Sequence, residues 1–174
     1  MSSVYENQLN DWVNKEKLGV NLLNSIGDLM YDKGIELILF RKQLLEIGVS
    51  ELMNYFSYAR DVVGRKNNVE TANMLALEML NMNLSASKID IGLLTAEYIE
   101  SGSTDANTFL SDKLSHVIDA DTSSIHAKDV ILYGFGRIGR LAARELIKQA
   151  GKGQQLRLKA IAVRRLTDAQ IIKR

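Results

Sequence analysis

Asp129-Val-Ile-Leu-Tyr-Gly-Phe-Gly-Arg-Ile-Gly-Arg140 is the most informative stretch of this sequence. Its first part, Val130 to Tyr133, is a short apolar run with β-branched residues, which is typical of a buried strand. The glycines that follow are spaced Gly-x-Gly-x-x-Gly, and an amphipathic helical pattern continues after them. A strand, a glycine turn and a helix in this order form the context in which a dinucleotide-binding fingerprint occurs.

Each glycine has a separate physical role in such a fingerprint. Gly134 allows a tight turn, and Gly136 lets the backbone come close to a pyrophosphate. Gly139 has no Cβ, so the helix can pack closely against the strand. The free N–H groups and the positive end of the helix then face the phosphates. The same spacing also occurs in strand-to-helix turns that bind no ligand, so the spacing alone leaves both interpretations open.

The residue types within the motif are more specific than its spacing. The heptapeptide Gly134-Phe-Gly-Arg-Ile-Gly-Arg140 resembles the N-terminal fingerprint of glyceraldehyde-3-phosphate dehydrogenases. The segment Leu156–Val163 is similar to the second strand of that family. The resemblance covers roughly residues 129–165, about a fifth of the chain.

The resemblance implies a Rossmann dinucleotide-binding domain that holds NAD or NADP. The family oxidises glyceraldehyde 3-phosphate in the presence of inorganic phosphate, so the complete enzyme would also bind a small phosphorylated aldehyde, and we expect it to form a homo-oligomer. The residues that would line the cofactor pyrophosphate are Gly134, Phe135, Gly136, Arg137, Ile138 and Gly139.

The catalytic part of that family has no counterpart in this sequence. The family uses a Cys nucleophile and a His on a second domain, whereas this chain contains no Cys and its histidines, His116 and His126, precede the fingerprint. Residues 129–174 suffice for a strand, a helix, a strand and the beginning of another helix. We therefore expect the N-terminal portion of a longer enzyme, inactive by itself. The alternative is a non-enzymatic helical interaction or oligomerisation protein with a vestigial βαβ unit.

The end of the expected second strand bears on the choice of cofactor. In NAD enzymes an acidic residue near this point binds the ribose hydroxyls. Here the strand ends Ala162-Val-Arg-Arg165, and the next acidic residue is Asp168. Arg164 could pair with a 2′-phosphate, which would favour NADP, or it could point into solvent.

The region before the fingerprint has a mainly helical pattern from Val4 to about Asn83. Leu37, Phe40, Leu44 and Leu45 fit one face of a helix, and Ser50 is the expected N-cap of the next. Further helices are expected over residues 71–82, after Ser85 or Ser87 as far as Glu100, and over residues 108–118. The predicted fold is a helical N-terminal extension, residues 1–127, followed by an incomplete Rossmann βαβ domain, residues 128–174.

Composition and charge exclude several functional classes. Without Cys there is no disulfide framework or thiolate zinc site, and no metal site is expected at the histidines. No apolar run approaches the ~20 residues of a membrane span, and the N-terminus lacks the basic and apolar regions of a signal peptide, so no membrane partner and a cytoplasmic location are expected. Residues 1–128 carry 11 basic and 18 acidic residues, a net charge of −7, whereas residues 129–174 carry 11 and 3, a net of +8. The basic part could hold an anionic cofactor or pair with the acidic part; nucleic acid is the least expected partner, because no aromatic stacking platform accompanies the basic residues.

Overall fold

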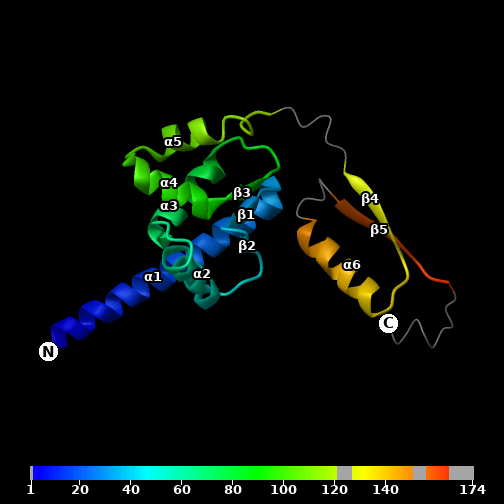
Figure 1. Cartoon of the computed structure of the whole chain (residues 1–174), viewed down its shortest axis with the longest axis horizontal. Coiled ribbons are helices and arrows are strands. Elements are labelled where there is room, and N and C mark those ends of the chain that lie inside the picture. Colours follow the sequence, from blue (N-terminus) through cyan, green and yellow to red (C-terminus); the bar gives the residue numbers. More distant parts are fainter. Residues whose placement is uncertain (1, 121–126, 151–155, 165–174) are drawn as a thin grey trace. The chain divides into compact units, whose positions relative to one another are not determined.

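The computed structural model describes residues 2–120, 127–150 and 156–164 of the chain. The chain forms two compact units, Met1–Ala120 and Asp121–Arg174 (Figure 1). The boundary expected from the sequence, between residues 127 and 128, lies a few residues after the division between Ala120 and Asp121. Residues 121–126 are outside the described part. Among the described residues, no helix combines the length and the apolar character that crossing a bilayer requires.

Helices make up most of the first unit. The longest, α1 (Ser2–Asp28), continues into a short π-helical turn, η1 (Leu29–Lys33), which ends at Gly34 in the left-handed conformation with φ 72°. The shorter helices of this unit are α2 (Val49–Asp61), α3 (Val69–Asn81), α4 (Ile91–Ser101) and α5 (Ala106–Lys113).

Short polar side chains begin three of these helices. Asn68 accepts from the N–H of Thr71 at the start of α3, and Asp90 and Asp105 accept in the same way at α4 and α5. The caps expected from the sequence were different. Ser50 lies inside α2, whose N-cap is Gly48, and Asp90, rather than Ser85 or Ser87, caps α4. A carboxylate is also favoured by the positive end of the helix, so it competes well with serine for this position.

A small mixed sheet interrupts the helices of the first unit. Its strands are β1 (Glu36–Leu39), β2 (Lys42–Gln43) and β3 (Lys88–Asp90), in the order β2-β1-β3. β1 pairs antiparallel with β2 and parallel with β3. The prediction of a helix across Leu37–Leu45 is therefore wrong, and the first unit is a mixed α/β structure.

The hairpin between β1 and β2 explains why the sequence pattern wrongly predicted a helix here. Its turn residues, Phe40 and Arg41, have φ of 44° and 71°. Positive φ at both central residues is what a two-residue hairpin with a type I′ turn requires. Asn and Gly usually supply such angles, so this turn has no recognisable sequence signal. The carboxylate of Asp90 supports it by accepting the N–H of Phe40 at 3.1 Å. A short apolar run without turn residues fits a strand and a helix equally well.

One hydrophobic core joins the helices and the sheet of the first unit. Helix α1 packs mainly against α3 and also against α2, and β1 crosses beside α4. Leu37 and Leu39, alternate residues of β1, are buried, which matches the two-residue repeat of a strand. The largest fully buried side chains are Phe56, Leu22, Leu29, Ile35, Leu37, Leu39, Leu44, Leu52, Leu75, Met79, Ile91 and Leu110.

The second unit consists of β4 (Lys128–Tyr133), α6 (Arg137–Gln149) and β5 (Leu156–Ala162). The two strands pair in parallel, with Tyr133 opposite Ala162, and α6 packs on them. This strand–helix–strand order is the arrangement that the sequence pattern predicted for these residues.

The second unit buries few of its apolar side chains. Among its described residues only Ala143 is a fully buried hydrophobic residue, at 5% exposure. Ile131, Tyr133 and Ile138 are 65%, 77% and 75% exposed. A unit of this kind gains little free energy from burial, whereas the first unit has an extensive core.

This contrast leads to a prediction about residues 1–120 expressed alone. We expect a helix-rich circular dichroism spectrum and one cooperative thermal transition, because the core lies within this segment. Phe56→Ala should lower the free energy of unfolding by about 3–5 kcal/mol, since Phe56 is 2% exposed. A gradual, non-cooperative melt of the parent segment would contradict the assignment of an independent core.

Candidate functional site

The glycine turn of the second unit begins where β4 ends. Gly134 has φ 99°, a region that residues with a side chain rarely adopt. Its N–H donates to the carbonyl oxygen of Ala162 at 2.6 Å, so the turn is fixed to the end of β5. The turn therefore lies at the carboxyl ends of two parallel strands, which is where ligands bind in open α/β sheets.

Gly139 lies against the backbone of this turn. A Cβ at residue 139 would be 2.2 Å from the carbonyl oxygen of Gly134 and 3.1 Å from its carbonyl carbon. Backbone atoms of the turn cannot move aside as the end of a flexible side chain can. Only glycine fits here, as the close-packing role of the third glycine requires.

Gly136 has the opposite surroundings. A Cβ at this position would meet no atom within 4 Å, and its φ of −77° is open to any residue. No contact within the described part of the chain requires glycine at residue 136. Glycine is a common N-cap residue, as at Gly48, and the open space at Gly136 also leaves room for a closely approaching ligand.

Helix α6 starts immediately after Gly136. Gly136 is its N-cap and supplies no side chain to accept the first N–H groups of the helix. The first N–H groups of a helix have no partner within it, and the helix dipole adds partial positive charge. The first turn contains no acidic residue, and Arg137 and Arg140 add cationic charge. These features together favour an anion such as a phosphate.

A shallow hollow of about 430 Å³ lies over this turn. Of the residues expected at the cofactor site, Gly134, Gly136, Arg137, Ile138 and Gly139 line it, whereas Phe135 and Arg164 do not. The hollow is also lined by three residues that were not among the expected cofactor-site residues: Leu132, Tyr133 and Ala142. Sequence position was the available signal for two of these residues as part of the site. Tyr133 directly precedes Gly134, and Ala142 lies about one helical turn after Gly139.

Arg164 follows the end of β5, two residues after Ala162, and is exposed. The register places Ala162 opposite Tyr133, so Arg164 belongs to the same end of the sheet as the glycine turn. The carboxylate of Asp129 lies at the other end, near the starts of the strands. There it pairs with Arg157 at 3.0 Å and Lys159 at 3.8 Å. That carboxylate therefore does not neutralise the positive groups around the turn.

The described residues contain no recognisable catalytic group at this hollow. No cluster of three or more His, Asp or Glu side chains among them could hold a metal ion. The perturbed pKa values belong to the first unit. Hydrogen bonds from Thr108 lower the pKa of Asp105 at the start of α5, and the hydrogen bond to Glu51 raises the pKa of Tyr55. The arrangement can hold an anion, and it offers no nucleophile or general base.

The two glycines give a matched pair of substitutions with opposite expected effects on the fold. Gly136→Ala should leave β4, α6 and β5 intact, because its Cβ enters open space. Gly139→Ala should disrupt them, because its Cβ would overlap the Gly134 carbonyl oxygen. Amide hydrogen exchange in α6 of the whole chain measures the difference. Equal protection in both variants would show that α6 does not approach the turn as closely as described.

Comparison with known proteins gives one informative similarity. No family model matches the chain. The chain is 30% identical over 153 residues to a "Glyceraldehyde-3-phosphate dehydrogenase-like protein" of Pseudomonas aeruginosa (strain UCBPP-PA14). The match includes 86% of this chain, so it extends over most of both units, and only 33% of the relative. The chain thus spans about a third of the length of the curated relative it matches, and its similarity to a protein of this kind reaches well beyond the glycine motif.

Proposed function

We propose that the second unit is the beginning of a Rossmann domain that binds the pyrophosphate of NAD or NADP in a glyceraldehyde-3-phosphate dehydrogenase-related protein. The observation that carries this proposal is the contrast between two glycines. Gly139 is required by contact with Gly134, whereas Gly136 faces open space at the start of a helix. A turn without a ligand explains the first glycine, and the open space over the second is what a pyrophosphate would need.

The pyrophosphate would lie over the first turn of α6. Its oxygens would accept from the free N–H groups after Gly136, and the Arg137 guanidinium would add charge at the rim of the hollow. Ile138, also at the hollow, offers apolar contact. Phe135 is assigned to this site by the family resemblance alone, since it does not line the hollow.

Arg164 is the residue that we propose for cofactor choice. It stands at the end of β5 where NAD enzymes of this shape have an acidic residue, and no acidic residue is found near it among the described residues. A guanidinium can pair with the 2′-phosphate of NADP through two parallel hydrogen bonds. NADP is therefore the favoured cofactor. If Arg164 points into solvent, the site binds NAD and NADP with similar affinity.

The oxidation of a phosphorylated aldehyde is proposed only for a longer protein that contains this chain. That reaction needs a thiolate nucleophile, and none of the 174 residues is a cysteine. The role left for these residues is to hold and orient the dinucleotide. The catalytic residues, the substrate site and any homo-oligomer contacts of the dehydrogenase domain would lie elsewhere.

A second candidate function is that of an interaction protein whose βαβ unit binds nothing. The observation that favours it is the difference in burial, because the first unit has a developed core, whereas Ala143 is the one fully buried hydrophobic residue among the described residues of the second. The two candidates differ in one measurable property, which is dinucleotide binding at the glycine turn.

Titration of the ¹⁵N-labelled chain with NADP⁺ should move the amide resonances of the turn and of the first turn of α6. Gly136→Val should abolish these shifts, because the branched Cβ would occupy the space that the pyrophosphate needs. In a complete dinucleotide domain, Gly136→Val should reduce the free energy of dinucleotide binding by on the order of several kcal/mol, since steric exclusion and lost phosphate hydrogen bonds combine. Gly48→Val is a matched control, since Gly48 is also an N-cap where a Cβ would meet no atom within 4 Å, but it belongs to the first unit. Absence of any shift in the parent chain favours the interaction protein.

Arg164→Asp should reduce the preference for NADP over NAD by roughly ten- to a hundredfold, because a charge-assisted hydrogen bond contributes about 1.5–3 kcal/mol. The ratio of the two dissociation constants measures it. Arg144→Asp is the control, since it makes the same change of charge at an exposed position of α6. An equal change of the ratio in both variants would reflect general electrostatics, and Arg164 would then have no specific role.

A further inference from the structure

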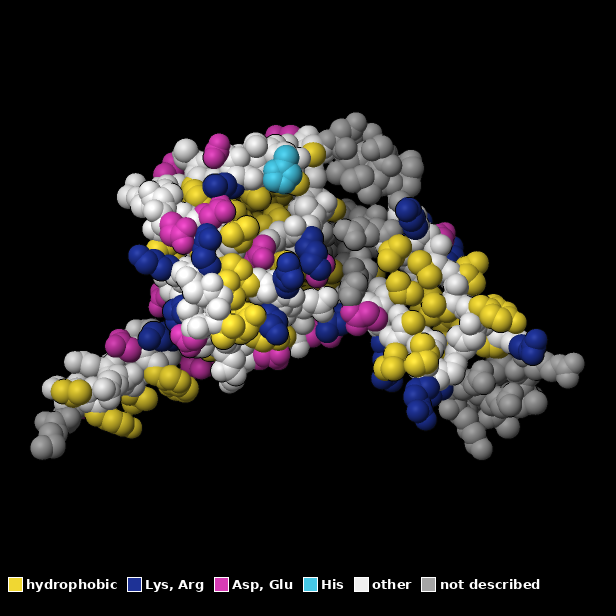
Figure 2. All heavy atoms as spheres, viewed as in Figure 1, with side chains coloured by type: hydrophobic (Ala, Val, Ile, Leu, Met, Phe, Trp, Pro, Cys, Tyr) yellow, Lys and Arg dark blue, Asp and Glu magenta, His cyan; other side chains and the backbone are white. Residues whose placement is uncertain are grey.

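The amino-terminal half of α1 extends beyond the core of the first unit. Every described side chain from Ser3 to Trp12 is exposed, and the first buried position of the helix is Gly19. Figure 2 shows hydrophobic side chains along this end of the helix. A helix that ends in solvent has no reason to carry large apolar side chains, so these residues need a partner.

Four of the five large apolar side chains between Ser3 and Val13 gather along one side of the helix, and Val4 lies outside this group. Tyr5, Leu9 and Trp12 are 67%, 44% and 59% exposed, and the half-buried Val13 continues the series. Tyr5, Leu9 and Val13 follow one another at steps of four, and Trp12 is three residues after Leu9, so the four form a continuous stripe. We call these four residues the α1 stripe. The apolar side chains that α1 buries in the core, Leu22 and Ile26, lie in its carboxyl-terminal half.

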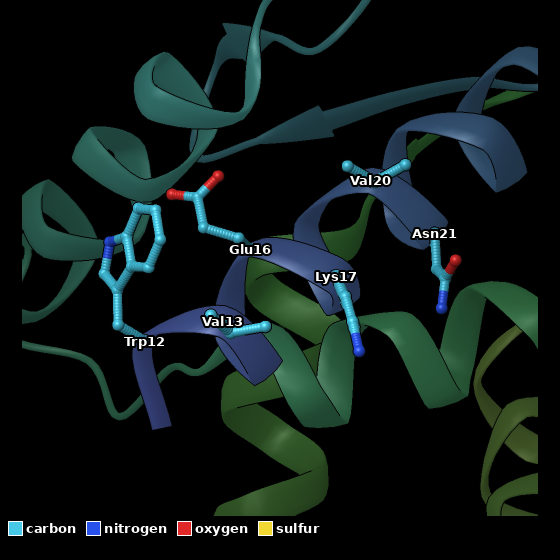
Figure 3. Close-up of a pocket in the computed structure, with 6 residues that line it drawn as sticks. All are labelled: Trp12, Val13, Glu16, Lys17, Val20 and Asn21. Carbon is cyan, nitrogen blue, oxygen red and sulfur yellow. The ribbon is translucent and has the colours of Figure 1, made fainter. Parts of the chain in front are cut away.

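A groove suited to another helix runs beside the α1 stripe. The hollow of about 270 Å³ in Figure 3 is lined only by α1. Trp12, Glu16 and Val20 form one of its walls, and Val13, Lys17 and Asn21 form the other. Each wall is a row of residues four apart. Helices pack by placing such a row of one helix into the groove between two rows of the other.

Charges beside the α1 stripe make it complementary to itself. Glu6 and Lys17 are eleven residues apart, about three helical turns, so they lie on the same flank. Gln8 and Lys15 are two turns apart on the other flank. In an antiparallel pair centred between Asp11 and Trp12, Glu6 of one copy is level with Lys17 of the other, and Gln8 with Lys15. Within the described residues, neither Glu6 nor Lys17 has an ion-pair partner in its own chain.

The size of the α1 stripe agrees with a dimer of moderate stability. An aromatic side chain can bury about 150–250 Å². Two copies contribute four aromatic side chains together with Leu9 and Val13 of each. The surface area that these side chains can bury approaches the roughly 1,000 Å² that a specific interface needs. We propose that the exposed half of α1 pairs antiparallel with the same segment of a second copy of this chain, with Trp12 near the centre of the interface.

Trp12 is the only tryptophan of the chain, so its fluorescence reports on this interface directly. The dimer should dissociate on dilution over about a hundredfold range of concentration, as mass action requires, and the emission should shift to longer wavelength as Trp12 enters water. Leu9→Lys should give a monomer by sedimentation equilibrium, with red-shifted emission at all concentrations. Val62→Lys, at an exposed position in the first unit outside the α1 stripe, should behave as the parent chain. A monomeric parent chain, or an oligomer that survives Leu9→Lys, overturns the proposal.

Charge exchange tests the antiparallel pairing. Glu6→Lys and Lys17→Glu should each weaken the dimer several-fold, because each places like charges opposite one another. The double variant should restore the parent dissociation constant, since the pair is then only reversed. Additive weakening in the double variant would overturn the antiparallel arrangement, and circular dichroism confirms that each variant keeps its helix content.

Discussion

The distance between Gly139 and the carbonyl oxygen of Gly134 is the constraint on which the second unit depends. A separation that leaves no room for one carbon atom fixes how closely α6 approaches the turn. That approach aligns the start of the helix with the carboxyl ends of β4 and β5. The free N–H groups and the open space at Gly136 follow from the same geometry. The proposed anion site is thus a consequence of backbone packing, and few side chains would take part in it.

The sequence predicts this local geometry well because it is set by short-range steric rules. Three glycines at fixed spacing, after an apolar run and before an amphipathic pattern, leave little freedom to the backbone. The strand expected from Val130 begins at Lys128, and α6 begins within the motif. Placement of Phe135 and Arg164 is a different matter, since it depends on side-chain directions and on parts of the sheet beyond two strands. The motif carries no information about either.

The first unit shows where such rules fail. The helices α2 and α3 appear close to the positions that their periodicity predicts, because amphipathic patterns of more than three turns are hard to mistake, whereas the shorter α5 ends at Lys113, five residues before its expected end. β1 and β2 are too short for periodicity to separate strand from helix, and their turn uses Phe40 and Arg41 where Asn and Gly are usual. Contacts distant in sequence support this turn, among them the carboxylate of Asp90 and the ring of Phe40 beside Gly92. Local pattern cannot reveal contacts of that kind.

The pairing of β1 with β3 also has a consequence for how the first unit reaches its fold. The hydrogen bond between Phe40 and Asp90 joins residues 50 apart, and the ion pair between Glu36 and Lys88 joins residues 52 apart. Such contacts require a long loop to close before they add stability, and loop closure slows folding relative to a helical bundle of the same size. During synthesis, α1 and β1 leave the ribosome well before β3 exists. Until then β1 has an unpaired edge, and the first half of the unit must wait for residues near 90 before its core can close.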